Sequence, residues 1–163
     1  MSKAGNRSGQ GNIQNERLEG RLGKHDLDNI SFRQDKTFDS GLVADLYRRS
    51  GINRPFSDLG RIHKMIENSN LIIGAWAGQE LVGIARSLTD FSYACYLSDL
   101  AVDKVYQGKG IGTELIRLTQ EAAGEESMLL LVSAPTAMSY YNRVASQLGL
   151  APKENAWFIP RKK

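Results

Sequence analysis

Three glycines alternate in the stretch Gln107-Gly108-Lys109-Gly110-Ile111-Gly112, which follows the apolar run Leu100-Ala101-Val102 and opens an amphipathic segment, 113–118. A loop between a strand and a helix can present several backbone N–H groups to one anion, at the positive end of the helix dipole. Glycines also let the backbone approach a ligand closely and adopt positive φ angles. We therefore interpret this stretch, called the glycine loop below, as a candidate phosphate site. The alternative is an ordinary glycine-rich turn.

The spacing of the glycines excludes two common nucleotide motifs. The dinucleotide fingerprint needs glycines at its first, third and sixth positions, and the sixth position counted from Gly108 is Thr113. The sequence also lacks a GxxxxGK[ST] element. What remains is Gln-x-x-Gly-x-Gly between a predicted strand and a predicted helix.

Hydrophobic periodicity and turn residues predict the elements that would hold this loop. The predicted order is one strand, two helices, three strands, a helix, a strand, a helix and a last strand. The strands are expected at 30–34, 70–76, 81–88, 93–102, 128–132 and 156–159. Polar Ser98 and Asp99 interrupt the fourth strand, as at a β-bulge. The run 128–132 has no polar alternation, which predicts a central strand covered on both faces.

The motif and the order of elements together resemble the GNAT N-acetyltransferase superfamily, whose acyl-CoA pyrophosphate loop is written Arg/Gln-x-x-Gly-x-Gly/Ala. The resemblance covers roughly residues 30–160 and is most specific at 100–118. It implies an α/β fold with a central mixed, mostly antiparallel sheet of six to seven strands and about four helices. A splayed wedge is expected between strands 4 and 5. Three further stretches look like those of small bacterial and plastid GNAT enzymes: Asn68-Ser69-Asn70, Leu81–Arg86 and Ser98–Asp103.

The resemblance implies that the chain binds acetyl-CoA as a co-substrate and transfers its acetyl group directly to a primary amine. The backbone of the fourth strand would hold the pantetheine arm, and the glycine loop would bind the pyrophosphate. Gln107 would add a side-chain donor, and Lys109 a charge. The thioester would lie near 98–100, opposite Ser133. The expected cofactor-binding residues are Leu100, Ala101, Val102, Gln107, Gly108, Lys109, Gly110, Ile111, Gly112 and Ser133.

Two side chains are candidates for the proton transfers. The family places a tyrosine on the helix after the central strand, as the second residue of an aromatic pair, and the match is Tyr141 after Tyr140. Tyr141 would protonate the leaving thiolate, although it could instead be a packed aromatic residue. Asp99 is our candidate base, because burial of a carboxylate raises its pKa towards a useful value. Asp99 could equally pair at the bulge, and a chain of water molecules could replace a base.

Composition narrows the classes of partner and location. The chain has 163 residues, 41% of them hydrophobic, with a net charge of +3 and one cysteine, Cys95, which predicts one globular domain without a disulfide or a multi-cysteine metal site. No metal and no nucleic-acid or membrane partner are expected, and the cytoplasm is the expected location.

Residues 1–29 are expected to form a flexible leader before a domain at 30–163. An exposed last strand would support a homodimer. The alternative function is a non-catalytic acyl-CoA sensor of the same fold.

Overall fold

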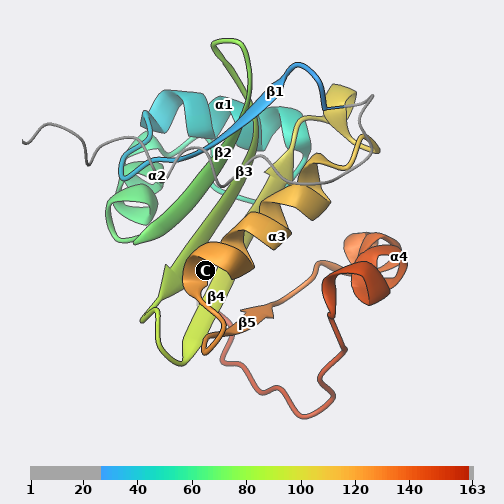
Figure 1. The fold of residues 1–163 in the computed structure, drawn as a ribbon. Coiled ribbons are helices and arrows are strands. Elements are labelled where there is room, and N and C mark those ends of the chain that lie inside the picture. The colour runs from blue at the N-terminus through green and yellow to red at the C-terminus, as the bar shows by residue number, and fades with distance from the viewer. Residues whose placement is uncertain (1–26, 162–163) are drawn as a thin grey trace, which may run out of the picture.

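Five strands form one sheet in the order in which they occur along the chain (Figure 1). The computed structural model describes residues 27–161, so the predicted leader lies almost wholly outside the described residues. Neighbouring strands are antiparallel, except that β4 and β5 are parallel. The strands are β1 (Ile30–Gln34), β2 (Leu71–Ala77), β3 (Glu80–Thr89), β4 (Ala94–Val102) and β5 (Met128–Leu131).

Helices cover both faces of the sheet. Figure 1 shows α3 across one face, α1 and α2 on the other, and α4 to the side of α3. Two short 3-10 turns precede α3 and α4. The helical elements are α1 (Ser40–Ser50), α2 (Leu59–Glu67), η2 (Lys104–Tyr106), α3 (Ile111–Ala123), η3 (Pro135–Ala137) and α4 (Met138–Leu148). The predicted mixed fold with four α-helices is therefore confirmed.

Capping residues define ends of α1, α2 and α4. The Asp39 side chain accepts a hydrogen bond from the Leu42 N–H, and the Asp58 side chain accepts one from the Arg61 N–H. Gly51 ends α1 and Gly149 ends α4, both in the left-handed conformation that glycine adopts without steric cost.

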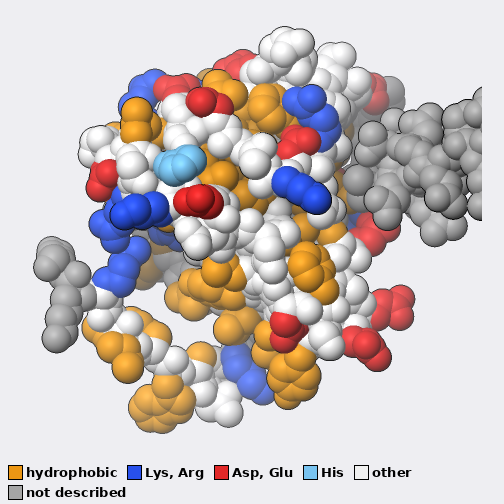
Figure 2. Space-filling model, turned by 90° about the vertical axis from the view of Figure 1, so that its left-hand side faces the viewer, with side chains coloured by type: hydrophobic (Ala, Val, Ile, Leu, Met, Phe, Trp, Pro, Cys, Tyr) orange, Lys and Arg blue, Asp and Glu red, His pale blue; other side chains and the backbone are white. Residues whose placement is uncertain are grey.

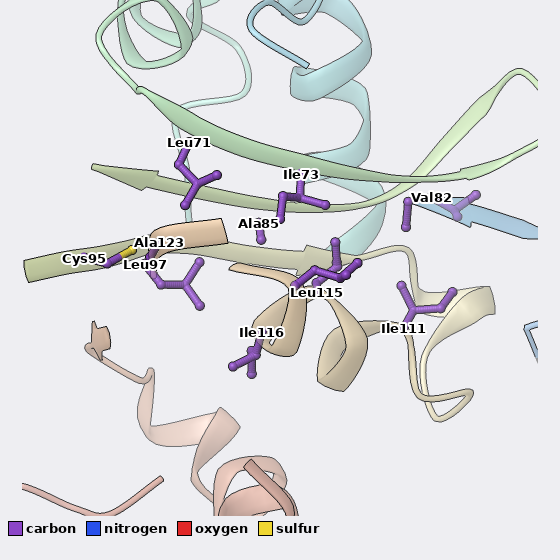
Figure 3. Packing of buried hydrophobic residues seen from close by; sticks show 12 residues of the cluster. Leu71, Ile73, Val82, Ala85, Cys95, Leu97, Ile111, Leu115, Ile116 and Ala123 are labelled. Carbon is purple, nitrogen blue, oxygen red and sulfur yellow. The ribbon is translucent and has the colours of Figure 1, made fainter. Parts of the chain in front are cut away.

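The core is split by the sheet into two layers. Alternate side chains of a strand point to opposite faces, so Leu71 and Ile73 of β2 face α3, whereas Ile72 faces α1 and α2. Figure 3 shows Leu115 and other side chains of α3 directed at the strand residues of the first layer. The second layer includes Leu46 of α1.

Within residues 27–161 the sheet has five strands, which differs from the six to seven predicted. The segment 156–159 forms no strand: Trp157, Phe158 and Ile159 are 95%, 82% and 97% exposed. Figure 2 shows hydrophobic side chains along the C-terminal segment, next to its grey end, standing clear of the rest of the surface. A segment of high β-propensity forms a strand when it pairs with a neighbouring strand, and residues 156–159 have no such neighbour in the described structure.

The predicted central position of β5 is also wrong. β5 is four residues long and, among the strands of the described residues, lies at the edge of the sheet with β4 as its one partner. Met128 and Leu130 are exposed on the face opposite α3, and Leu129 and Leu131 pack towards α3. An unbroken apolar run therefore does not by itself guarantee that a strand is covered on both faces.

Candidate active site

A wedge opens between β4 and β5 where their pairing stops. The parallel register runs from Ala94↔Met128 to Leu97↔Leu131, and β4 then continues to Val102 with only β3 beside it. The predicted splay between the fourth and fifth strands is therefore present. We use "the wedge" for residues 98–102 of β4 and the segment 132–134 that leaves β5.

The predicted β-bulge is confirmed at the point where the wedge begins. Arg86 of β3 is opposite Asp99 of β4, but the next residue, Ser87, is opposite Leu97. Ser98 is thus the extra residue of β4, without a partner in the register. A bulge bends the strand and changes the direction of the residues after it, which turns the end of β4 away from β5.

Beyond the bulge, two residues of β4 turn their backbone groups into the wedge. The Asp103 N–H donates to the Val82 carbonyl at 2.9 Å. Asp103 and Val82 are therefore a hydrogen-bonded pair of the β3–β4 ladder, and every second residue of β4 before Asp103 also bonds to β3 as far as the bulge. Backbone groups alternate in direction along an antiparallel pair, so those of Ala101 point to β3. Those of Leu100 and Val102 point the other way, into the wedge. Ala101 serves the sheet and the core, where it is buried.

The glycine loop begins α3 with unpaired N–H groups. The first backbone bond of the helix runs from the Glu114 N–H to the Gly110 carbonyl, so the N–H groups of Ile111, Gly112 and Thr113 precede the helical ladder. Gly110 caps the helix without a side-chain hydrogen bond. Gly108 and Gly110 have φ angles of 79° and 87°, and a Cβ at either would meet no atom within 4 Å.

Other side chains of the loop have neighbours of their own. The Gln107 amide donates to the Val102 carbonyl at 2.9 Å, which ties the loop to the end of β4. The Lys109 ammonium lies 5.0 Å from the centre of the Tyr106 ring. The Ile111 side chain is buried in the core, so only its backbone could reach a ligand. Ser133 donates its hydroxyl to Met138 Sδ at 2.9 Å, on the opposite side of the wedge from β4.

The two adjacent tyrosines of α4 differ in their contacts. The Tyr140 hydroxyl lies 3.4 Å from Thr113 Oγ1, and a Cβ at Gly112 would be only 2.8 Å from it. Gly112 is thus small enough to let α4 approach the first turn of α3. The ring of Tyr141 meets that of Tyr140 edge-on, with centroids 5.1 Å apart. Burial, with the neighbouring Tyr140, raises the pKa of Tyr141 to about 12, so its phenol stays protonated near neutral pH.

Asp99 lies on the other face of β4 from Leu100, among charged and polar groups. The Asp99 side chain itself is fully buried. Its Oδ2 accepts hydrogen bonds from Arg86 Nε and from the Tyr47 hydroxyl, the latter at 2.7 Å. Its Oδ1 accepts a hydrogen bond from Arg54 Nε at 2.5 Å. We call these four residues the Asp99 cluster.

The pKa expectation for Asp99 is wrong. Burial alone raises this pKa, but the hydrogen bond and charge of Arg86, the charge of Arg54 and the hydrogen bond from Tyr47 together hold it below its ordinary value. A carboxylate that is charged and already accepts hydrogen bonds from Arg54, Arg86 and Tyr47 binds a further proton poorly. The geometry therefore supports the alternative interpretation of Asp99 as a paired residue at the bulge, and base catalysis by Asp99 stays a prediction.

Burial of Tyr47, with the neighbouring Asp99 charge, raises the pKa of its phenol, so Tyr47 enters the cluster as a neutral hydrogen-bond donor. Two neighbouring arginines at the end of α1 also have carboxylate partners. Arg48 pairs with Asp45, and Arg49 pairs with Asp45, Glu80 and Asp103.

Sequence reasoning missed Arg86 and Tyr47 as members of the cluster. A signal was present, because Arg86 and Asp99 are the lone charged residues inside two successive apolar strands. A tight antiparallel pair brings such residues opposite each other, which the register Arg86↔Asp99 does. Tyr47 gave no comparable signal, since the helix periodicity marked it only as a core residue.

A hollow of about 570 Å³ lies at the far end of β4, between the end of α2 and the turn that joins β3 to β4. Its polar side chains serve the local turns: Asn70 bonds both backbone groups of Thr89, and Asp90 accepts three backbone N–H bonds. This hollow is therefore not part of the wedge.

Two kinds of feature are absent from the described part of the chain. Residues 27–161 contain no cluster of three or more His, Cys, Asp or Glu that could hold a metal ion. Within the same range, no helix is long and apolar enough to cross a membrane.

Residues 43–145 match the family model for the acetyltransferase (GNAT) domain, and the chain belongs to this family. A curated relative, an uncharacterized ycf52-like N-acetyltransferase of Prochlorococcus marinus, is 27% identical over 140 residues, covering 82% of this chain and 76% of the relative. The chain is therefore an acyltransferase that transfers groups other than aminoacyl groups.

Solved structures support the same fold. A protein of unknown function from meticillin-resistant Staphylococcus aureus superposes with a TM-score of 0.69 at 18% identity, over 82% of this chain and 99% of that one. An aminoglycoside N-acetyltransferase in complex with CoA gives a TM-score of 0.62 at 16% identity, over 82% and 95% of the two chains. At these identities the likeness shows the fold alone.

Proposed function

We propose that this protein is an acetyl-CoA-dependent N-acetyltransferase that passes the acetyl group directly to a primary amine. The observation that carries the proposal is the line of available backbone groups from the wedge to the glycine loop. Leu100 directs its main-chain groups into the wedge, as does the Val102 N–H, while the Val102 carbonyl accepts the Gln107 amide. The unpaired N–H groups of α3 begin shortly after them along the chain. An amide-bearing arm that ends in a pyrophosphate needs donors and acceptors in this order.

The glycine loop fits a pyrophosphate on two counts. The N–H groups of Ile111, Gly112 and Thr113, with the helix dipole, favour negative charge. The open space at the Cβ positions of Gly108 and Gly110 leaves the backbone accessible. In this proposal Lys109 adds charge at the rim, and Gln107 holds the loop against β4 instead of donating to the phosphate.

Acetyl-CoA would supply the activated thioester in the wedge, next to Ser98–Leu100 and across from Ser133. The amine nitrogen forms a bond to the carbonyl carbon, and the bond from that carbon to sulfur breaks. The Leu100 N–H donates to the carbonyl oxygen as charge develops there. Tyr141 gives its proton to the departing sulfur, and the amine proton leaves to water or to Asp99. The Asp99 cluster makes water the better acceptor, because its guanidinium groups already neutralise the carboxylate.

The first test is binding and turnover of acetyl-CoA. A ligand that binds only the folded state adds about 2.7 kcal/mol of stability at 100 times its Kd, which raises Tm by roughly 10 °C in a domain of this size. We expect such a shift with acetyl-CoA and with CoA, together with release of free thiol when a panel of primary amines is added. No shift at saturating acetyl-CoA would sink the proposal, and a shift without thiol release across the panel would indicate a binding protein.

The adjacent tyrosines offer a matched test of the proton donor. Replacing Tyr141 by Phe is expected to lower kcat by about 100-fold, as loss of a general acid does, while the acetyl-CoA Kd stays the same. The control, Tyr140→Phe, keeps the edge-on ring contact and removes only the hydroxyl near Thr113. Its kcat should change far less. Steady-state kinetics and calorimetric binding of both variants decide the question, and equal losses of binding and turnover in Tyr141→Phe would assign that residue to packing.

A homodimer remains part of the proposal. The apolar side chains of Trp157, Phe158 and Ile159 are exposed, and β5 has an unpaired edge in the sheet as described. Both features favour association with a second copy through this end of the molecule.

A further inference from the structure

One loop on the α1 and α2 side of the sheet reaches the wedge through a single arginine. The loop 51–58 joins α1 to α2, and Arg54 lies at its centre. Arg54 Nη2 donates to the Ser98 carbonyl at 2.7 Å, and its Nε donates to Asp99 Oδ1. Its Nη1 donates to the Asn53 carbonyl of its own loop at 2.8 Å. The guanidinium thus contacts the loop and two successive residues of β4 at once.

The two β4 contacts lie on the bulge itself. Ser98 is the extra residue, so its carbonyl belongs to the part of β4 where the regular ladder with β3 is interrupted. A peptide unit is planar, and holding the Ser98 carbonyl therefore fixes the peptide plane between Ser98 and Asp99. The N–H of Leu100 follows in the next peptide plane, so its direction depends on this anchor.

The rest of the Asp99 cluster anchors Asp99 within the sheet without help from Arg54. Arg86 contacts Asp99 Oδ2, Ser98 Oγ at 2.8 Å and Ser69 Oγ at 2.7 Å. The side chain of Arg86 is nearly buried, whereas that of Arg54 is 23% exposed. Replacing Arg54 therefore leaves the buried carboxylate with the more deeply buried of its two charged partners, Arg86.

We propose that Arg54 is a positioning residue for acyl transfer. It holds the bulge from the α1–α2 loop and so aims the Leu100 N–H at the reacting carbonyl, and this role rests on the function proposed above. Arginine suits the task because its planar fork bonds a carboxylate and a carbonyl at fixed spacing. Lysine keeps the charge but cannot hold both acceptors in one geometry. The loop and the wedge are thereby coupled: a displacement of Arg54 changes the direction of the Leu100 N–H.

The experiment compares Arg54→Lys with a control on another face, Arg117→Lys. Arg117 is 32% exposed and pairs with Glu114 and Glu121 on α3, so it loses comparable ion pairs without touching β4. We expect Arg54→Lys to lower kcat about tenfold or more, with Tm within a few degrees of wild type and acetyl-CoA Kd within about threefold. Arg117→Lys should keep the wild-type kcat. A wild-type kcat in Arg54→Lys would overturn the proposal. A fall in kcat that is fully accounted for by the fraction of unfolded protein would overturn it as well.

A second readout does not depend on turnover. In protein labelled with 15N-leucine, the Leu100 amide resonance should shift in Arg54→Lys and stay unchanged in Arg117→Lys. If the wild type shows no acetyl transfer but the Leu100 resonance shifts, the proposed function fails, and what stands is the structural coupling of Arg54 to the Leu100 N–H. If the wild type is active and the resonance does not move, the positioning role fails. Arg54→Gln, which removes the charge as well, should move the resonance at least as far as Arg54→Lys does.

Discussion

Replacing Asp99 by asparagine is expected to destabilise the fold by about 3–5 kcal/mol, the usual cost of breaking a buried ion pair by removing one partner. Asp99 is fully buried and accepts hydrogen bonds from Arg54, Arg86 and Tyr47. Asparagine has nearly the same shape but no charge, so the guanidinium of Arg86 would remain desolvated and uncompensated. Because a domain of this size is stable by roughly 5–15 kcal/mol, the variant would be marginal. Urea unfolding followed by circular dichroism measures the loss.

The control for this prediction is Asp45→Asn. Asp45 also lies between two arginines, Arg48 and Arg49, but its side chain is 47% exposed. Exposed pairs contribute about 0–1 kcal/mol, so this variant should remain close to wild type. Equal losses in the two variants, or a loss below about 1 kcal/mol in Asp99→Asn, would contradict the argument that burial makes the difference.

The substitution Asp99→Asn also changes how the free energy of unfolding depends on pH. The folded pKa of Asp99 is lowered, so the unfolded chain takes up the proton first as the pH falls. The stabilising contribution of Asp99 is therefore complete above its unfolded pKa of about 3.9 and is lost as the pH falls through the lower, folded value. The difference in unfolding free energy between wild type and Asp99→Asn should shrink below about pH 4. A difference that does not change with pH would contradict this assignment.

Replacing Gly110 by valine is expected to abolish acetyl-CoA binding, with at least about a 100-fold rise in Kd, equivalent to roughly 2.7 kcal/mol. Gly110 has a φ of 87° and caps α3, next to the unpaired N–H groups of its first turn. A Cβ there meets no protein atom within 4 Å, so the space that valine fills is the space a phosphate would use. Isothermal titration calorimetry with CoA measures the change.

Backbone strain has to be separated from this steric effect. Valine in the left-handed region costs about 1–2 kcal/mol of folding stability whatever the ligand. Gly149→Val is the matched control, because Gly149 is also left-handed, with a φ of 68°, has open space at its Cβ position and lies at the end of α4. It should lose similar stability and keep its CoA affinity. Wild-type affinity in Gly110→Val would remove the glycine loop from the binding site.

Much of the fold could be predicted because its signals are local. Asp39 and Asp58 are residue types that favour helix N-caps, and they cap α1 and α2. The hairpin strands follow the predicted apolar runs. Interruption of an apolar run by Ser98 and Asp99 predicted the bulge. The strand predicted at 156–159 is absent from the structure. Strand formation depends on pairing with the edge of another strand, which the local sequence does not specify.

In the candidate site, too, local features could be predicted from the sequence, whereas features that depend on tertiary contacts could not. The sequence by itself determined the glycine loop, because positive φ angles and free N–H groups follow from glycine spacing at a helix start. Only the tertiary structure decided the state of Asp99. Whether a buried carboxylate gains or loses a proton depends on which charges face it, and Tyr47, Arg54 and Arg86 come from three other segments of the chain. Desolvation alone would have raised the pKa, but two guanidinium groups brought close by folding reverse that direction.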